Sequence, residues 1–141
     1  MWDPNQMTPI GKTFVEIDAE QAVYVKAANE ALASARGQRA RWWSFMVSHY
    51  TFELVVGDAA GKDNIVLCLA ACRNISGPVS WPNQQLKVLW HNDPIERKWD
   101  YVLLDDTVGF RAEAGVFGWE RNYDLLELGS LYCPRDSQHN T

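Results

Sequence analysis

The sequence has few of the features that mark secreted, membrane-spanning or disulfide-stabilised proteins. Its 141 residues include three cysteines, which are too few and too unevenly spaced for a disulfide framework. The N-terminus has neither a basic start nor an apolar run, so we expect no signal peptide. No stretch approaches the ~20 apolar residues that a transmembrane helix needs. We therefore expect a soluble, cytoplasmic protein that does not bind a membrane.

Signatures of catalysis and of cofactor binding are also lacking. The segment Gly57–Asp63 comes nearest to one, because it resembles the phosphate-binding loop G-x-x-x-x-G-K-[ST]. Its glycines are one residue too close together, and Asp63 replaces the hydroxyl residue that would hold magnesium. We interpret this segment as a hairpin loop. No set of four ligands with zinc-site spacing is present either, so we expect neither a cofactor nor a metal ion.

The composition is that of a globular protein, with 47% hydrophobic and 22% charged residues. A chain of this length is expected to form a single domain over residues 1–141, with flexible tails at about residues 1–12 and 133–141. The formal net charge is -5, from 13 basic and 18 acidic residues. A field of this sign mildly repels nucleic acids.

One principal helix is predicted near the N-terminus, over residues 19–36. Asp18 is suited to accept hydrogen bonds from the free N–H groups of the first turn, and Gln21 three residues later resembles a capping box. Gly37 suits the left-handed residue that often follows a helix. The run Thr13–Ile17 before it is interpreted as a short strand or as an anchor.

Strand patterns dominate the rest of the chain. Apolar residues alternate from Trp42 to Val56, but their parity switches around Ser48 and His49, which predicts a bulge or a break. The segment Ile65–Cys72 is apolar on both parities, which favours a strand covered on both faces over a short helix. Further strands are predicted at 86–91, 99–104 and 108–114, the last two forming a hairpin. Without a βαβ rhythm, the pattern predicts an α+β domain with a mainly antiparallel sheet of about four to six strands and the helix packed on one face.

Tryptophan is the most unusual component, with seven residues in the chain. A domain of this size is not expected to bury all seven, and exposed tryptophans are enriched in ligand grooves and protein interfaces. Trp81, which Pro78 and Pro82 flank in a short loop, is a candidate pocket wall, although packing over the sheet end explains it as well. We hypothesise a small binding or interaction domain, such as a protein–protein adaptor or an immunity-like protein. Its ligand would be a protein partner, a second copy or a small molecule.

A small enzyme is the alternative. His49 lies where the strand parity switches, and bulges sometimes direct side chains into sites. His91 ends a predicted strand beside Asn92 and Asp93. A histidine paired with a carboxylate in a sheet-end pocket could act as a general base near neutral pH. No catalytic signature accompanies either histidine, so a structural or surface role is favoured and no catalytic residue is assigned.

Nucleic-acid binding is a second alternative. Arg36, Arg39 and Arg41 run directly into Trp42 and Trp43, and arginine with aromatic side chains can hold phosphates and stack on bases. A helix C-terminus followed by the start of a strand explains the same residues. Because the net charge is negative, we consider this function the least favoured of the three.

Overall fold

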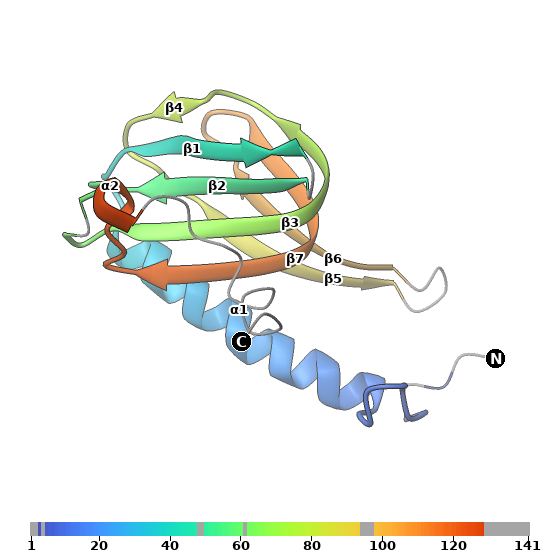
Figure 1. Ribbon diagram of the computed structural model, residues 1–141. Coiled ribbons are helices and arrows are strands. Elements are labelled where there is room, and N and C mark those ends of the chain that lie inside the picture. The colour runs from blue at the N-terminus through green and yellow to red at the C-terminus, as the bar shows by residue number, and fades with distance from the viewer. Residues whose placement is uncertain (1–2, 4, 48–49, 61, 94–97, 129–141) are drawn as a thin grey trace.

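One long helix packs against a curled, seven-stranded antiparallel sheet in the computed structural model of the protein (Figure 1). The structure describes residues 3, 5–47, 50–60, 62–93 and 98–128. Its elements, in chain order, are α1 (Phe14–Ser34), β1 (Ala40–Met46), β2 (Thr51–Val56), β3 (Ile65–Ser76), β4 (Ser80–Trp81), β5 (Lys87–Asp93), β6 (Lys98–Asp105), β7 (Phe110–Arg121) and α2 (Leu125–Leu128). The strand order across the sheet is β4-β1-β2-β3-β7-β6-β5. The α+β class and the antiparallel sheet are thus confirmed, but the sheet has more strands than predicted.

The helix begins earlier than the sequence predicted. Thr13 is the N-cap: its hydroxyl accepts a hydrogen bond from the N–H of Glu16 at 3.1 Å, and the Glu16 carboxylate accepts from the N–H of Thr13 at 3.3 Å. This capping box satisfies free donors of the first turn five residues before the predicted start. Asp18 is therefore not a cap but a residue inside the helix. Its carboxylate instead accepts hydrogen bonds from Trp90 Nε1 and Asn92 Nδ2, both at 2.9 Å.

The C-terminal end of α1 is held by a buried glutamine from the loop after β4. Gln84 Nε2 donates to the carbonyl oxygens of Leu32 and Ala35, at 3.2 and 2.9 Å. These carbonyls belong to the last turn, where no intrahelical N–H groups remain to satisfy them all. Gly37 follows with φ 91°, as predicted for a left-handed residue after the helix.

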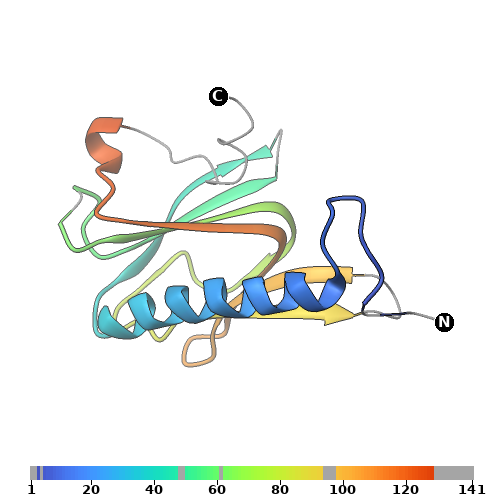
Figure 2. The same ribbon diagram turned by 90° about the horizontal axis from the view of Figure 1, so that it is seen from below.

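The core lies between α1 and the inner face of the sheet, as Figure 2 shows from below. Alternate residues of the strands supply it, because successive side chains of a strand point to opposite faces. The helix contributes Val25, Ala28, Ala31 and Leu32. The largest fully buried side chains include Tyr101, Phe52, Phe110, Phe117 and Leu103. No described helix is long and apolar enough to cross a membrane.

Most predicted strands are present with shifted ends. Ile65–Cys72 is strand rather than helix, and its residues from Ile65 to Ala70 are all buried. The predicted hairpin is β6 and β7, but β7 continues to Arg121, because its second half pairs with β3. The predicted interruption separates β1 from β2, and Ser48 and His49 themselves lie outside the described residues.

The segment that resembled a phosphate loop connects β2 to β3 in an antiparallel hairpin, as the sequence indicated. Within it, the N–H of Ala60 donates to Asp58 Oδ1 at 2.9 Å, which is an Asx turn. Asn64, which is fully buried, donates from Nδ2 to the carbonyls of Asp58 and Tyr123, both at 2.7 Å. These bonds tie the loop to the chain after β7.

Two irregularities bend the sheet at the end where β1 meets β2. Ala71 has φ 53°, and the β3–β7 register shifts between Cys72 and Asn74. A third irregularity lies in β1, where the register shifts between Trp42 and Ser44. Bulges increase local twist and bend the strand that carries them. The second half of β3 consequently curls over the end of β1.

Candidate functional site

The bend of β3 forms a cavity of about 380 Å³ at the open end of the curled sheet. This cavity, which we call the mouth pocket, is lined by Trp42, Phe45, Tyr50, Cys72, Arg73, Asn74 and Ile75. Its volume lies in the range of small-molecule sites, which is roughly 300–1,000 Å³. The lining is mostly apolar, with few polar groups, as is usual for sites that bind organic ligands.

Three parts of the chain bring these side chains together. Trp42 and Phe45 come from β1, and Tyr50 comes from the connection to β2. The segment Cys72–Ile75 comes from the bent half of β3. The N–H of Cys72 donates to the carbonyl oxygen of Tyr50 at 3.1 Å, which holds the connection against the bend. The pocket therefore depends on contacts between residues more than 20 positions apart in the sequence.

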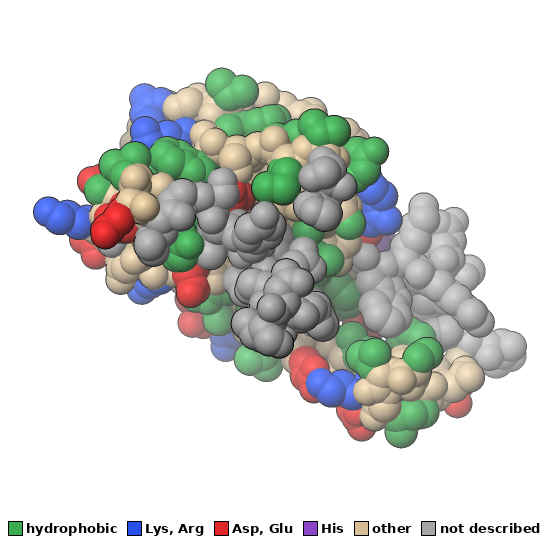
Figure 3. Space-filling model, in the orientation of Figure 1, with side chains coloured by type: hydrophobic (Ala, Val, Ile, Leu, Met, Phe, Trp, Pro, Cys, Tyr) green, Lys and Arg blue, Asp and Glu red, His purple; other side chains and the backbone are tan. Residues whose placement is uncertain are grey.

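The rim of the mouth pocket carries exposed aromatic side chains. Phe45 is 43% exposed and Tyr50 is 58% exposed. Hydrophobic side chains gather over this end of β1 and β2 in Figure 3, with basic side chains beside them at the edge of the view. Large apolar side chains that remain exposed around a hollow are typical of binding surfaces.

Trp42 forms the inner wall of the pocket. Its ring contacts Phe52 edge-on, with ring centroids 4.5 Å apart and an interplanar angle of 68°. This arrangement is favourable for two aromatic quadrupoles and fixes the indole plane. Trp42 Nε1 is buried, and no described residue accepts a hydrogen bond from it. Buried donors are normally paired, so an unpaired indole N–H is unusual for a residue that serves packing alone.

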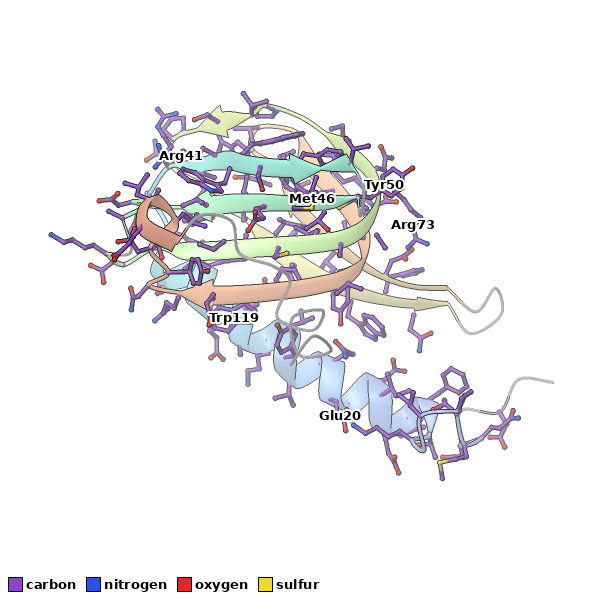
Figure 4. All side chains as sticks on the ribbon, in the orientation of Figure 1. Glu20, Arg41, Met46, Tyr50, Arg73 and Trp119 are labelled. Carbon is purple, nitrogen blue, oxygen red and sulfur yellow. The ribbon has the colours of Figure 1, made fainter. Side chains whose placement is uncertain are left out.

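Arg73 is the charged residue in the described lining. Figure 4 shows Arg73 and Tyr50 at the same end of the sheet, and Trp119 away from them on β7. The Arg73 guanidinium forms an ion pair with Asp100 of β6, whose side chain is 15% exposed, while half of the Arg73 side chain remains exposed. Guanidinium has five N–H donors, so one carboxylate does not exhaust its hydrogen-bonding capacity.

Cys72 contributes a half-buried free thiol to the lining. Burial raises the pKa of this thiol to about 11, against a smaller lowering effect of a hydrogen bond from the Phe52 backbone. A thiol of this kind is protonated at neutral pH and is a poor nucleophile. In the mouth pocket Cys72 therefore acts as an apolar wall. Cys68, on the same strand, is disulfide-bonded.

His91, one of the two histidines considered for catalysis, lines a second hollow of about 480 Å³ on the outer face of β5, β6 and β7. His91 lies directly opposite Asp100 in the β5–β6 register, so the structure brings a histidine and a carboxylate together. Both carboxylates that line this hollow contact arginines: Asp100 pairs with Arg73, and Glu113 pairs with Arg111 at 3.0 Å. Among the described residues, His91 has no ion pair. His49 lies outside the described residues.

The arginine and tryptophan residues considered for nucleic-acid binding do not share one surface. Strand alternation places Trp42 against the main core and Trp43 against the separate cluster of Val55 and Leu125 on the outer face. Arg36 and Arg39 are exposed, and Arg39 Nη1 donates to Ser80 Oγ at 2.8 Å, whereas Arg41 is half-buried. These five side chains therefore form no continuous stacking platform.

None of the five tryptophans whose side chains the structure describes is a fully exposed residue. Trp81 is 3% exposed, and its Nε1 donates to Asp105 Oδ2 at 2.8 Å, so it is a core residue rather than a pocket wall. Trp42, Trp43, Trp90 and Trp119 are partly buried against core clusters. The exposed rings at the mouth pocket belong to phenylalanine and tyrosine instead.

Sequence reasoning identified Trp42 of this site, though for a different ligand, and missed Phe45, Tyr50 and Arg73. The parity switch around Ser48 and His49 indicated an irregularity between the two strands that meet here. It did not indicate that β3 bends at Ala71, which has an unremarkable sequence context. No family model, curated protein or solved structure matches the chain.

Proposed function

We propose that this protein is a binding domain whose ligand is a small apolar molecule held in the mouth pocket. The observation that carries the proposal is the lining itself, in which three aromatic side chains surround a hollow of about 380 Å³. Two of these rings, Phe45 and Tyr50, stay exposed. Covering them with a ligand would remove apolar surface from water, at about 25 cal/mol per Å².

The proposal narrows the hypothesis of a binding or interaction domain that the sequence suggested. An apolar pocket of this size fits a ring system or a short aliphatic chain better than a flat protein surface. The prediction of a protein partner, adaptor-like or immunity-like, or of self-association stays a prediction. The low cysteine count does not assign the protein to the cytoplasm, because Cys68 is disulfide-bonded and such bonds persist mainly in oxidising compartments.

The test is a titration with 2-naphthalenemethanol, a neutral bicyclic probe of about 12 heavy atoms. Ligands of this size gain roughly 0.3–0.5 kcal/mol per heavy atom, so we expect a dissociation constant of about 0.04–2 mM. Two-dimensional ¹H–¹⁵N NMR detects such affinities. The indole N–H of Trp42, assigned with Trp42→Phe, should shift with saturation at one probe per chain.

Phe45→Ala should weaken binding of the probe by about fivefold or more, because it removes half-exposed apolar surface without creating a cavity in the core. Leu89→Ala is the matched control: Leu89 is 47% exposed on a strand, yet it lies outside the mouth pocket. The mouth pocket is not the site of the probe if the probe shifts NMR signals of residues elsewhere in the protein. The same conclusion follows if Phe45→Ala and Leu89→Ala weaken its binding equally.

A further inference from the structure

We infer that the mouth pocket selects apolar molecules that carry an anionic group, such as a carboxylate, which Arg73 binds at the rim. This inference rests on the proposed function, because it names the chemical class of ligand for the same pocket. It follows from the position of one positive charge beside an otherwise apolar and aromatic lining.

Arg73 is placed and exposed in a way that suits this role. Half of its side chain is exposed, so an incoming group can reach the guanidinium without displacing the core. The bulge between Cys72 and Asn74 places Arg73 at the irregular point of β3, where it does not pair with a β7 residue in the regular register. Planar guanidinium groups bind carboxylates through paired hydrogen bonds, which are stronger than neutral ones.

The competing ligand class is an organic cation. Trp42, Phe45 and Tyr50 could in principle surround a quaternary ammonium group, because the faces of aromatic rings attract cations. A cation in this pocket would lie beside Arg73, and like charges at such short range repel each other. The net charge of -5 does not reverse this preference, since charges further than about 8–10 Å away are largely screened at physiological salt. Arg73 lies in the lining and its partner Asp100 does not, so the charge nearest the pocket favours an anion.

Asp100 influences how strongly Arg73 binds an anionic ligand. Its carboxylate already pairs with Arg73, so a ligand carboxylate competes with it for the same donors. Removing the charge of Asp100 frees the guanidinium and also removes a negative charge near the ligand. The structure thus implies that Asp100→Asn tightens the binding of an anionic ligand and leaves a neutral ligand unaffected.

The experiment compares three probes with one ring system: 2-naphthoate, 2-naphthalenemethanol and 2-naphthylmethylammonium. In the unmodified protein we expect 2-naphthoate to bind about tenfold more tightly than the alcohol, and the ammonium probe to bind more weakly than the alcohol. The preference for 2-naphthoate should decrease as the salt concentration rises, because the rim is exposed. Asp100→Asn should increase it by about threefold or more.

Variants then assign the preference to Arg73. Arg73→Gln alone leaves Asp100 unpaired and repulsive, so the informative variant combines Arg73→Gln with Asp100→Asn. The double variant should bind 2-naphthoate and the alcohol with equal affinity. Arg111→Gln, which breaks the Arg111–Glu113 ion pair outside the mouth pocket, should keep the preference.

The outcomes separate the two proposals. Binding of the ammonium probe in preference to the alcohol, or a 2-naphthoate preference that survives in the double variant, would overturn the inference while leaving an apolar pocket in place. Equal binding of 2-naphthoate and the alcohol in the unmodified protein would do the same. If none of the three probes binds at the mouth pocket, the proposed function itself is wrong.

Discussion

The side-chain amide of Asn29, on α1, makes with Val88 the two hydrogen bonds that a neighbouring strand would make. Asn29 Nδ2 donates to the carbonyl oxygen of Val88 at 2.9 Å, and the N–H of Val88 donates to Asn29 Oδ1 at 2.7 Å. Val88 belongs to β5, the last strand of the sheet. Unpaired groups on an edge strand invite pairing with another chain. One helix residue therefore satisfies part of this edge and fixes α1 against it.

Asn29→Asp should destabilise the protein, because a carboxylate accepts from the Val88 N–H but cannot donate to the Val88 carbonyl. Two oxygens would then face each other at a part-buried site. We expect a loss of about 1–3 kcal/mol in the free energy of unfolding, measured by urea denaturation at neutral pH. Glu30→Gln, on the exposed side of the same turn, is the control and should change stability by less than about 0.5 kcal/mol. Equal stability of both variants would contradict the role assigned to Asn29.

A buried carboxylate plays a similar part at the end of β6. Asp105 Oδ2 accepts hydrogen bonds from Trp81 Nε1 and from the N–H of Gln85, both at 2.8 Å. Its Oδ1 accepts from the N–H of Thr107 at 3.0 Å and from the Thr107 hydroxyl. Burial alone would raise the pKa of Asp105, but these hydrogen bonds outweigh it, so the pKa lies below the usual value of 3.8. One charge thus connects the loop after β4 to the β6–β7 turn.

This lowered pKa makes stability depend on pH in the acid range. Well above pH 3.8 both folded and unfolded Asp105 are ionised, so its stabilising contribution is complete. As the pH falls through 3.8, the unfolded state binds a proton first, and the contribution is lost until the folded carboxyl is protonated as well. Asp105→Asn should be less stable at neutral pH by about 1–3 kcal/mol, because an amide cannot accept from all of these donors. Its stability should also fall less steeply with acid than that of the unmodified protein, as chemical denaturation at several pH values would show. A parallel acid dependence in the two proteins would contradict the lowered pKa.

Local signals in the sequence located the elements of the fold but not all of their ends. The capping residue of α1 illustrates the limit, since both Asp18 and Thr13 have side chains that suit an N-cap. The structure uses Thr13, because Asp18 is needed at 2.9 Å from Trp90 on β5. That contact joins positions 72 residues apart, and no local pattern contains it. The predicted number of strands was too low for a related reason. The two-residue β4 and the second half of β7 are strands only because they pair with other strands.

The mouth pocket could not be predicted from local sequence patterns, for the same physical reason. Trp42 and Phe45 could be assigned to a strand from their alternation, but Cys72–Ile75 reach them only because β3 bends. The bend depends on a left-handed conformation at Ala71, a residue that rarely adopts one, and on a bulge whose position is set by pairing with β7. Sequence patterns predicted which side chains of a strand share a face. Tertiary contacts determined which of these faces pack together.

The thiol of Cys72 offers a chemical probe of the same pocket. With its pKa at about 11, the thiolate fraction near pH 8 should be about a hundredfold lower than for an exposed cysteine of pKa 9.0. Alkylation by iodoacetamide, followed by mass spectrometry, should be correspondingly slow and should accelerate about tenfold per pH unit towards pH 11. Protein stability should decline over the same interval, from 9.0 to about 11, because the unfolded thiol ionises first. Leu89→Cys in a Cys72→Ser background provides an exposed thiol on a strand as the control. Reaction of Cys72 as fast as that control near pH 8 would mean that the bent half of β3 does not bury its side chain, and the wall assigned to the mouth pocket would be wrong.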